Sequence, residues 1–147
     1  MHREVQSPGD RMAQFVRPFE TLGDWTRSVA IYRYTTLGND PTRAALELRD
    51  RLKEANPDAQ SRLLVHSVTR DAIIDFLTWP PNGRYLELNV MRYAKDPGGK
   101  GLIAFRFTHR FQDARKEDAA QFTEKRLGWR SQVEAFDLTK GLAALGD

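Results

Sequence analysis

The sequence predicts an α+β domain, with a mainly antiparallel sheet of four to five strands and two helices packed on one face. Short runs of β-branched and aromatic residues alternate with polar ones, which indicates strands. Two longer segments repeat apolar residues at three- and four-residue spacing, which indicates helices. The predicted order is strand, helix, four strands, helix. An antiparallel sheet with both helices on one side can leave its second face partly exposed.

Length and composition set the first limits on function. The chain has 147 residues with 23 Lys plus Arg and 20 Asp plus Glu, and its net charge of +3 is small for a dedicated polyanion binder. Domains of about 100 to 150 residues are the commonest, which favours one domain. Cysteine is absent, which excludes a disulfide scaffold, thiolate catalysis and sulfur-bound zinc. No apolar run approaches the ~20 residues of a membrane-spanning helix, so we expect no membrane span.

The N-terminal part is predicted to hold a lead-in and two strands. Residues 1–10 are polar and contain turn formers, so we expect a disordered lead-in there and a single domain over 11–147. Residues 11–18 can form a short first strand, although their apolar spacing is irregular. Aromatic and β-branched residues alternate over 28–35, which predicts a strand.

A helix is predicted between two turn signals. Asp40 offers an N-cap oxygen, and Pro41 occupies the first helical position, where its missing N–H costs nothing. Apolar residues recur at helical spacing until the Asn-Pro pair at 56–57 ends the helix. Two strands follow, at 63–68 and 72–79. The second run also fits a helical turn, but we favour a strand because the run is short and a strong turn motif follows it.

The clearest hairpin joins residues 85–93 to residues 102–110 through a turn rich in glycine. Centring that turn pairs residues whose numbers sum to about 197, and this register sorts the side chains by polarity. One face gathers the apolar residues Leu86, Leu88, Val90, Phe105 and Phe107. The other face gathers Glu87, Asn89, Met91 and Tyr93 opposite Arg110, Thr108, Arg106 and Ala104.

A long helix is predicted over residues 115–136. Its apolar positions form one stripe at spacings of three and four residues, interrupted only by Arg126, whose aliphatic stem can still pack. The apolar members of the stripe are Ala119, Phe122, Trp129, Val133 and Phe136. We expect the stripe to pack against the sheet. Residues 138–147 are predicted to be either a docked tail or a frayed end.

The polar face of the hairpin is the candidate binding surface. Residues 84–110 contain six basic and two acidic side chains, a local charge of +4. Arginines on such a face can hold a carboxylate or phosphate through two parallel hydrogen bonds. The alternative is a solvated face with cross-strand ion pairs, Glu87 with Arg110 among them, each worth ~0.2 to 1 kcal/mol. The candidate ligand-binding residues are Arg106, Arg110, Glu87, Asn89, Thr108 and Tyr93.

Motifs for catalysis, metals or cofactors are not found in the sequence. His2, His66 and His109 lack the spacing of metal ligands. We place His66 inside a strand and His109 on the core face, as a hydrogen-bonded structural histidine beside Phe107. No GxSxG-like elbow occurs, and the glycine cluster at 98–101 joins two strands, which gives no phosphate cradle at a helix N-terminus. We therefore predict no catalytic residue, no metal and no cofactor.

Four stretches carry a resemblance to a known group of domains. They are Phe19-Glu20 to Asp24-Trp25-Thr26, Glu87-Leu88-Asn89, Phe107-Thr108-His109-Arg110, and Arg126 to Trp129. In these stretches the chain resembles uncharacterised bacterial secreted or periplasmic α+β domains, which implies an exported domain. Two features depart from that pattern: residues 1–10 lack the apolar segment of an export signal, and Val90 stands where we expect a basic residue, with Arg92 nearby. A cytoplasmic location is the alternative.

Three functions remain open, in order of preference. The first is a non-enzymatic binding or interaction module of the bacterial envelope, which recognises an acidic small molecule or a protein partner through an open sheet face at Arg106 and Arg110. The second is an enzyme in which Glu87 or Asp75 acts as acid or base beside those arginines. The third is a weak nucleic-acid binder, suggested only by tyrosines with neighbouring arginines.

Overall fold

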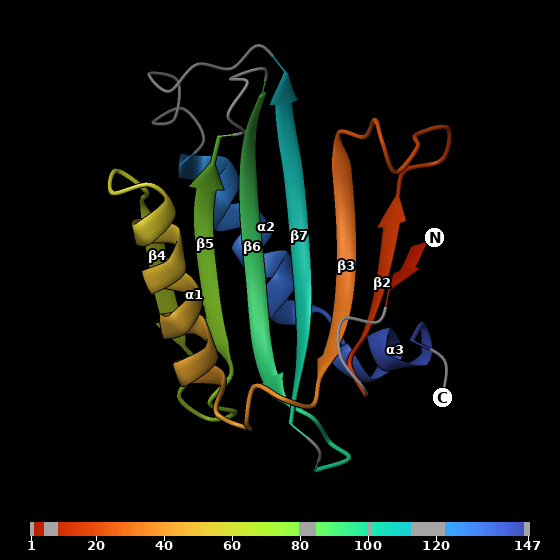
Figure 1. The fold of residues 1–147 in the computed structure, drawn as a ribbon, viewed down its shortest axis with the longest axis vertical. Helices are drawn as coiled ribbons and strands as arrows, with labels where there is room; N and C mark the ends of the chain where they lie inside the picture. The colour runs from red at the N-terminus through yellow and green to blue at the C-terminus, as the bar shows by residue number, and fades with distance from the viewer. Residues whose placement is uncertain (1, 5–8, 80–84, 100, 113–122, 146–147) are drawn as a thin grey trace.

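A seven-stranded antiparallel sheet forms the centre of the computed structural model, which describes residues 2–4, 9–79, 85–99, 101–112 and 123–145 (Figure 1). The strand order across the sheet is β1-β2-β3-β7-β6-β5-β4. The strands are β1 (His2–Glu4), β2 (Arg11–Val16), β3 (Arg27–Tyr34), β4 (Ser61–Val65), β5 (Ala72–Thr78), β6 (Tyr85–Lys95) and β7 (Leu102–Gln112). The helices are α1 (Pro41–Ala55), α2 (Thr123–Ala135) and α3 (Leu138–Ala143).

The predicted α+β class with an antiparallel sheet is confirmed, but the sheet has more strands than the four to five expected. Six strands of five or more residues are joined by the short strand β1, which pairs with β2 inside the predicted lead-in. The carboxylate of Asp10 is buried and accepts hydrogen bonds from the backbone N (2.6 Å) and Oγ1 (2.9 Å) of Thr35. These parts of the predicted lead-in therefore belong to the fold.

Helix α1 begins and ends where its sequence signals place it. The side chain of Asp40 accepts hydrogen bonds from the backbone N–H groups of Thr42 and Arg43, and Asn56 caps the other end. Its small and branched apolar residues pack on β4, β5 and β6. These residues are Ala44, Ala45, Leu48 and Leu52. We refer to the side of the sheet that they cover as the α1 face.

Helices α2 and α3 pack on the opposite side, which we refer to as the α2 face (Figure 1). The prediction that both helices cover one face is therefore wrong. The reason is visible in β5, where the consecutive residues Ile73 and Ile74 point to opposite faces and are both buried. A central strand that is apolar on both faces needs cover on both, so the helices divide between them.

The predicted hairpin of β6 and β7 is confirmed, including its register. Glu87 pairs with Arg110 and Asn89 with Thr108, which gives the expected sum of 197. In the turn, Gly101 has φ +117°, and a Cβ there would lie 2.2 Å from the backbone oxygen of Tyr34. The turn therefore depends on a glycine at this position.

The C-terminal part differs from its prediction in length. Helix α2 is described from Thr123, and the predicted stretch 115–122, with Ala119 and Phe122, lies outside the described residues. Within α2, Arg126 and Val133 are buried and Trp129 is half-buried, as the stripe predicts. Of the two alternatives for the tail, the docked one is confirmed for residues 138–145, because α3 packs beside β7 and Leu145 is buried. None of the described helices is long and apolar enough to cross a membrane.

Candidate functional site: the α1 face of the hairpin

All six predicted site residues lie on the α1 face of β6 and β7. The register pairs Glu87 with Arg110, Asn89 with Thr108, and places Arg106 opposite Met91 and Tyr93 opposite Ala104. Helix α1 packs on β4, β5 and β6, and in Figure 1 no described helix lies in front of β7, β3 or β2. Asn89, Thr108 and Tyr93 are nevertheless buried, and of the six predicted residues only Glu87, Arg106 and Arg110 are half-buried. The expected exposed face is therefore confined to these three side chains.

Arg110 is held from three directions. Its Nε donates to Oε1 of Glu87 at 2.8 Å, and its guanidinium lies 3.6 Å from the ring centroid of Trp25 and 4.6 Å from that of Tyr85. The backbone N of Arg110 also donates to the backbone oxygen of Thr26, which ties the loop carrying Trp25 to β7. The carboxylate and the two rings hold this guanidinium in one position within the fold. For Arg110, the cross-strand ion pair is the interpretation that fits.

Asn89 and Thr108 form an internal polar chain. Oγ1 of Thr108 donates to Oδ1 of Asn89 at 2.8 Å, and Nδ2 of Asn89 donates to Oγ1 of Thr78 at 3.3 Å. Both Asn89 and Thr108 are buried. Hydrogen bonding satisfies these groups inside the sheet, so they shape the floor of the face and do not offer free donors to a ligand.

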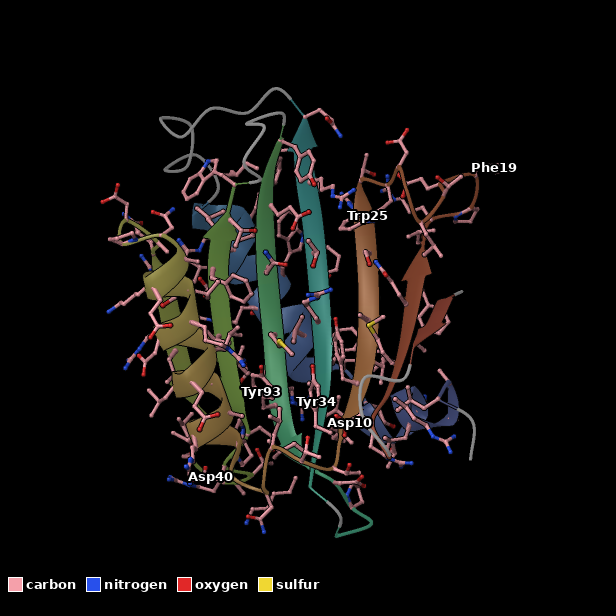
Figure 2. The ribbon with its side chains drawn as sticks, in the orientation of Figure 1. Asp10, Phe19, Trp25, Tyr34, Asp40 and Tyr93 are labelled. Atoms are coloured by element: carbon pink, nitrogen blue, oxygen red, sulfur yellow. The ribbon has the colours of Figure 1, made fainter. Side chains whose placement is uncertain are left out.

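Tyr93 is also buried, in the cluster that α1 covers. Burial raises the pKa of Tyr93 to about 12, and Arg51 opposes this shift only in part. The same desolvation raises the pKa of Tyr34 far above its usual value. Figure 2 shows Tyr34 and Tyr93 at one end of the α1 face and Trp25 at the other. Both phenols stay protonated at neutral pH, which makes them apolar packing elements with a neutral hydroxyl.

Arg106 differs from its neighbours. Its side chain is half-buried, and its guanidinium lies 5.5 Å from the ring centroid of Tyr32 on β3. It stands opposite Ala30 on one side and Met91 on the other, and neither offers a charged group. Among the described residues, no carboxylate pairs with Arg106. Of the six predicted residues, Arg106 is the cation whose N–H donors have no carboxylate acceptor among the described residues.

Asp75 does not join this cluster, so that form of the enzyme hypothesis is wrong. Asp75 lies on the α2 face, where its Oδ1 accepts from Nε of Arg126 at 2.8 Å and also from Nη2. Both side chains are buried. The interruption of the helical stripe by Arg126 is thus explained by a buried ion pair. A charged residue within the apolar strand 72–79 was the signal that could have located its partner.

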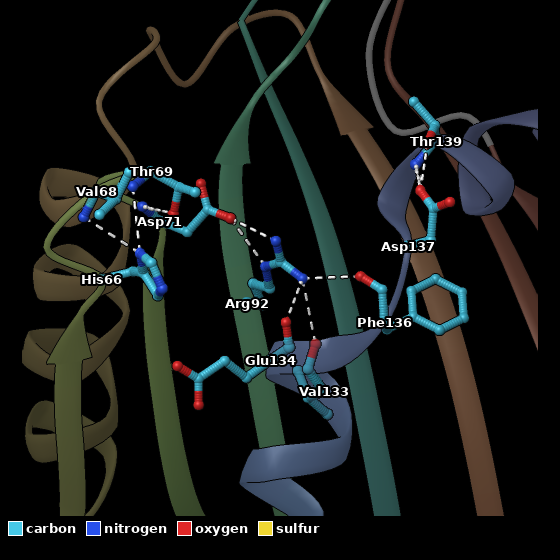
Figure 3. A network of polar contacts seen from close by, with 10 residues as sticks. All are labelled: His66, Val68, Thr69, Asp71, Arg92, Val133, Glu134, Phe136, Asp137 and Thr139. Atoms are coloured by element: carbon cyan, nitrogen blue, oxygen red, sulfur yellow. Dashed lines mark hydrogen bonds and ion pairs between the residues drawn. The ribbon is translucent and has the colours of Figure 1, made fainter.

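The half-buried Arg92 forms a second connection on the α2 face (Figure 3). Its Nε and Nη2 donate to Oδ2 of Asp71 at 2.9 and 2.6 Å. Its Nη1 donates to the backbone oxygens of Val133, Glu134 and Phe136, at 3.3, 3.0 and 2.9 Å. A single guanidinium therefore satisfies carbonyls at the C-terminal end of α2, where the helix leaves them without partners. Sequence reasoning did not assign this role to Arg92.

The comparisons with known proteins give a family and nothing beyond it. A family model of an uncharacterised bacterial family matches residues 2–138. The chain belongs to this family. No curated protein and no solved structure matches it. The matched span runs from β1 to the first residue of α3, so both the α1-face cluster and the buried pairs of the α2 face lie within the part that defines the family.

His66 and His109 are the two histidines of this family member whose side chains the structure describes, and both make contacts within the fold. The prediction that His66 lies inside a strand is wrong, because β4 ends at Val65. The Nδ1 atom of His66 accepts hydrogen bonds from the backbone N of Val68 and of Thr69 (Figure 3). His109 lies on the core face, stacked on Phe111 at 4.3 Å and near Trp129 at 4.9 Å. Burial, helped by nearby cations, lowers the pKa of His109 to about 4. Its buried Nδ1 has no hydrogen-bond partner among the described residues, so the expected hydrogen bond is not seen there.

Proposed function

We propose that this protein is a non-enzymatic binding module that holds a carboxylate group of its ligand against Arg106 on the α1 face. The observation that carries the proposal is the contrast between Arg106 and three other arginines, Arg92 and Arg110 on the same hairpin and Arg126 on α2. Arg92, Arg110 and Arg126 each meet a carboxylate of the chain, whereas Arg106 meets the Tyr32 ring. A guanidinium placed against a ring keeps its fork of donors oriented for a planar carboxylate.

The surroundings of Arg106 favour recognition over catalysis. The neighbouring Thr108 donates a hydrogen bond to Asn89, and Asn89 donates one to Thr78. Glu87, the remaining candidate acid or base, is held at 2.8 Å by Arg110. A general base must lie within hydrogen-bond reach of the proton that it removes, and the one carboxylate of this cluster is held by a cation of the chain.

The location follows as a separate part of the proposal. We propose the bacterial envelope, because the chain resembles secreted or periplasmic domains in the four stretches given above. Fractionation of cells that express the native gene, followed by immunoblotting of the periplasmic and cytoplasmic fractions, tests this part. Recovery of the protein in the cytoplasm alone would contradict the location and leave the binding proposal standing.

The binding proposal is tested by NMR titration of the ¹⁵N-labelled chain. The probes are citrate and a peptide of six glutamates, with sodium chloride at matched ionic strength as the reference. We expect saturable shifts for backbone amides of β3, β6 and β7 near Arg106. Arg106→Gln should weaken binding by about ten-fold or more, because a charge-assisted hydrogen bond contributes ~1.5 to 3 kcal/mol.

Two further variants sharpen the experiment. Arg106→Lys keeps the charge but removes the fork, and it should also bind weakly if the carboxylate is held by two parallel hydrogen bonds. Arg43→Gln removes an exposed arginine whose partner is Glu47 on the surface of α1, and it should bind as the wild type does. Equal losses for Arg43→Gln and Arg106→Gln would reduce the effect to net charge and overturn the proposal.

A further inference from the structure

A basic hollow lies at the β4 edge of the sheet, away from the α1-face cluster. Its volume is about 390 Å³, within the range of small-molecule sites. Two of its cations, Arg49 and Lys53, come from α1, a third is Arg62 on β4, and the fourth is Arg126 on α2. Its remaining lining residues are Ala59, Gln60 and Ser61, so four cations and no carboxylate line it among the described residues.

The charges of the hollow are only partly compensated within the chain. Arg126 is paired with Asp75, and Nε of Arg49 lies 3.6 Å from Oδ1 of Asp50, which is too far for a hydrogen bond. In the ranges that the structure describes, neither Lys53 nor Arg62 forms an ion pair. Opposing walls of like charge repel each other, and an anion between them would remove that repulsion.

Arg49, whose charge lies near Asp50, also has one hydrogen-bond donor without an acceptor in the described part of the chain. Its Nε is shielded from solvent and has no hydrogen-bond acceptor among the described residues. Buried donors are nearly always satisfied in folded proteins, so each exception calls for a cause. Lys53 has an ordinary role in the last turn of α1, where a cation stabilises the helix terminus. That role explains neither Arg49 nor Arg62.

We propose that this hollow binds a small anion that carries two or more phosphoryl groups. The cations that line the hollow come from α1 on one wall and from β4 and α2 on the other. A tetrahedral phosphoryl group accepts hydrogen bonds from several directions, whereas a planar carboxylate meets one guanidinium in its own plane. Gln60 and Ser61 add neutral donors at the rim. Several cations around one hollow suit a ligand with more than one charge.

The hollow is separate from the site of the proposed function. Arg62 stands at the register position opposite Asp75, at the edge strand β4. Arg106 lies on β7, and β6 and β5 separate that strand from β4. A ligand in the hollow therefore leaves the α1 face open, and the two sites can be tested independently.

Isothermal titration calorimetry with inorganic pyrophosphate tests the proposal, with sodium sulfate and sodium chloride at matched ionic strength as references. We expect saturable binding of pyrophosphate, and weaker binding of sulfate, which has a single tetrahedral group. The double variant Lys53→Ala with Arg62→Ala removes two exposed cations and should weaken pyrophosphate binding by at least about ten-fold.

The matched control is the double variant Arg43→Ala with Lys140→Ala, which removes the same charge from exposed positions outside the hollow. It should bind pyrophosphate within about two-fold of the wild type, since distant surface charges are screened over ~10 Å at 0.1 M salt. Arg106→Gln should also leave this binding unchanged.

Three results would overturn the assignment. They are a wild type that does not bind pyrophosphate saturably, equal losses in the two double variants, and preferential binding of single-stranded DNA that falls steeply with salt. The last would indicate a nucleic-acid backbone as the occupant. Loss of carboxylate binding by Arg106→Gln bears only on the α1 face, so the two proposals can fail separately.

Discussion

The arginines of the α2 face and the arginines on the uncovered part of the α1 face differ in how they are paired. On the α2 face, Arg92 and Arg126 are each paired with a carboxylate of the chain, and Arg92 also satisfies backbone oxygens of the α2 terminus. On the α1 face, Arg110 is paired with Glu87, but Arg106 has an aromatic ring instead. A charge under a helix must be paired because water cannot solvate it. Where α1 does not reach, an arginine can keep unpaired donors.

The largest expected effect comes from breaking the buried pair of the α2 face. Arg126→Met leaves the carboxylate of Asp75 buried without its cation, and we expect a loss of ~3 to 5 kcal/mol in the free energy of unfolding. Urea denaturation followed by circular dichroism measures it. The double variant Asp75→Leu with Arg126→Met removes both charges and should recover most of the loss. A single-variant cost below ~1 kcal/mol would mean that the pair is accessible to water.

The second effect concerns the end of α2. Arg92→Met removes the hydrogen bonds to Asp71 and to the carbonyls of Val133, Glu134 and Phe136, and it should cost ~1.5 to 3 kcal/mol. Amide hydrogen exchange should accelerate in the last turn of α2 more than in β3. Arg43→Met, at an exposed position of α1, serves as the control and should cost little. Uniform acceleration across the chain would show that Arg92 does not act locally.

A third experiment compares two arginines of the same face. Arg110→Gln loses an ion pair and two ring contacts, and should cost ~1 to 3 kcal/mol. Arg106→Gln should change the unfolding free energy by only ~0.5 kcal/mol. Thermal denaturation of both variants in one buffer gives the difference. Equal destabilisation would mean that Arg106 is a structural arginine like the others.

The last prediction is a pH dependence on the α2 face. The pKa of His109 is lowered by burial to about 4, whereas an exposed histidine titrates near 6.5. Above pH ~6.5 the His109 imidazole is neutral in both the folded and the unfolded chain, so the full stability is present. As the pH falls from there toward 4, the unfolded chain takes up a proton that the folded chain does not, so stability is lost. The free energy of unfolding, measured by urea denaturation at pH values from 7 to 4, should fall more steeply with decreasing pH for the wild type than for His109→Phe. Parallel curves would contradict the lowered pKa.

Sequence signals located the elements whose defining contacts join residues close together in the chain. The Asp40-Pro41 start and the Asn56 end of α1 follow from hydrogen bonds within a few residues. The register of the β6–β7 hairpin follows from alternation around one turn, because a slip by one residue would turn every apolar side chain outward. The polar set on one face of that hairpin was therefore predictable.

Long-range packing decided the remainder. Ile73 and Ile74 show that β5 is apolar on both faces, but only the assembled sheet shows α1 on one face and α2 on the other. Arg126 and Asp75 are 51 positions apart, and Arg49 and Arg62 meet only at the β4 edge. The sequence by itself determined helix ends, strand alternation and one hairpin, because these depend on neighbouring residues. The tertiary structure alone decided which charges are paired and which stay available, because burial depends on what packs above each side chain.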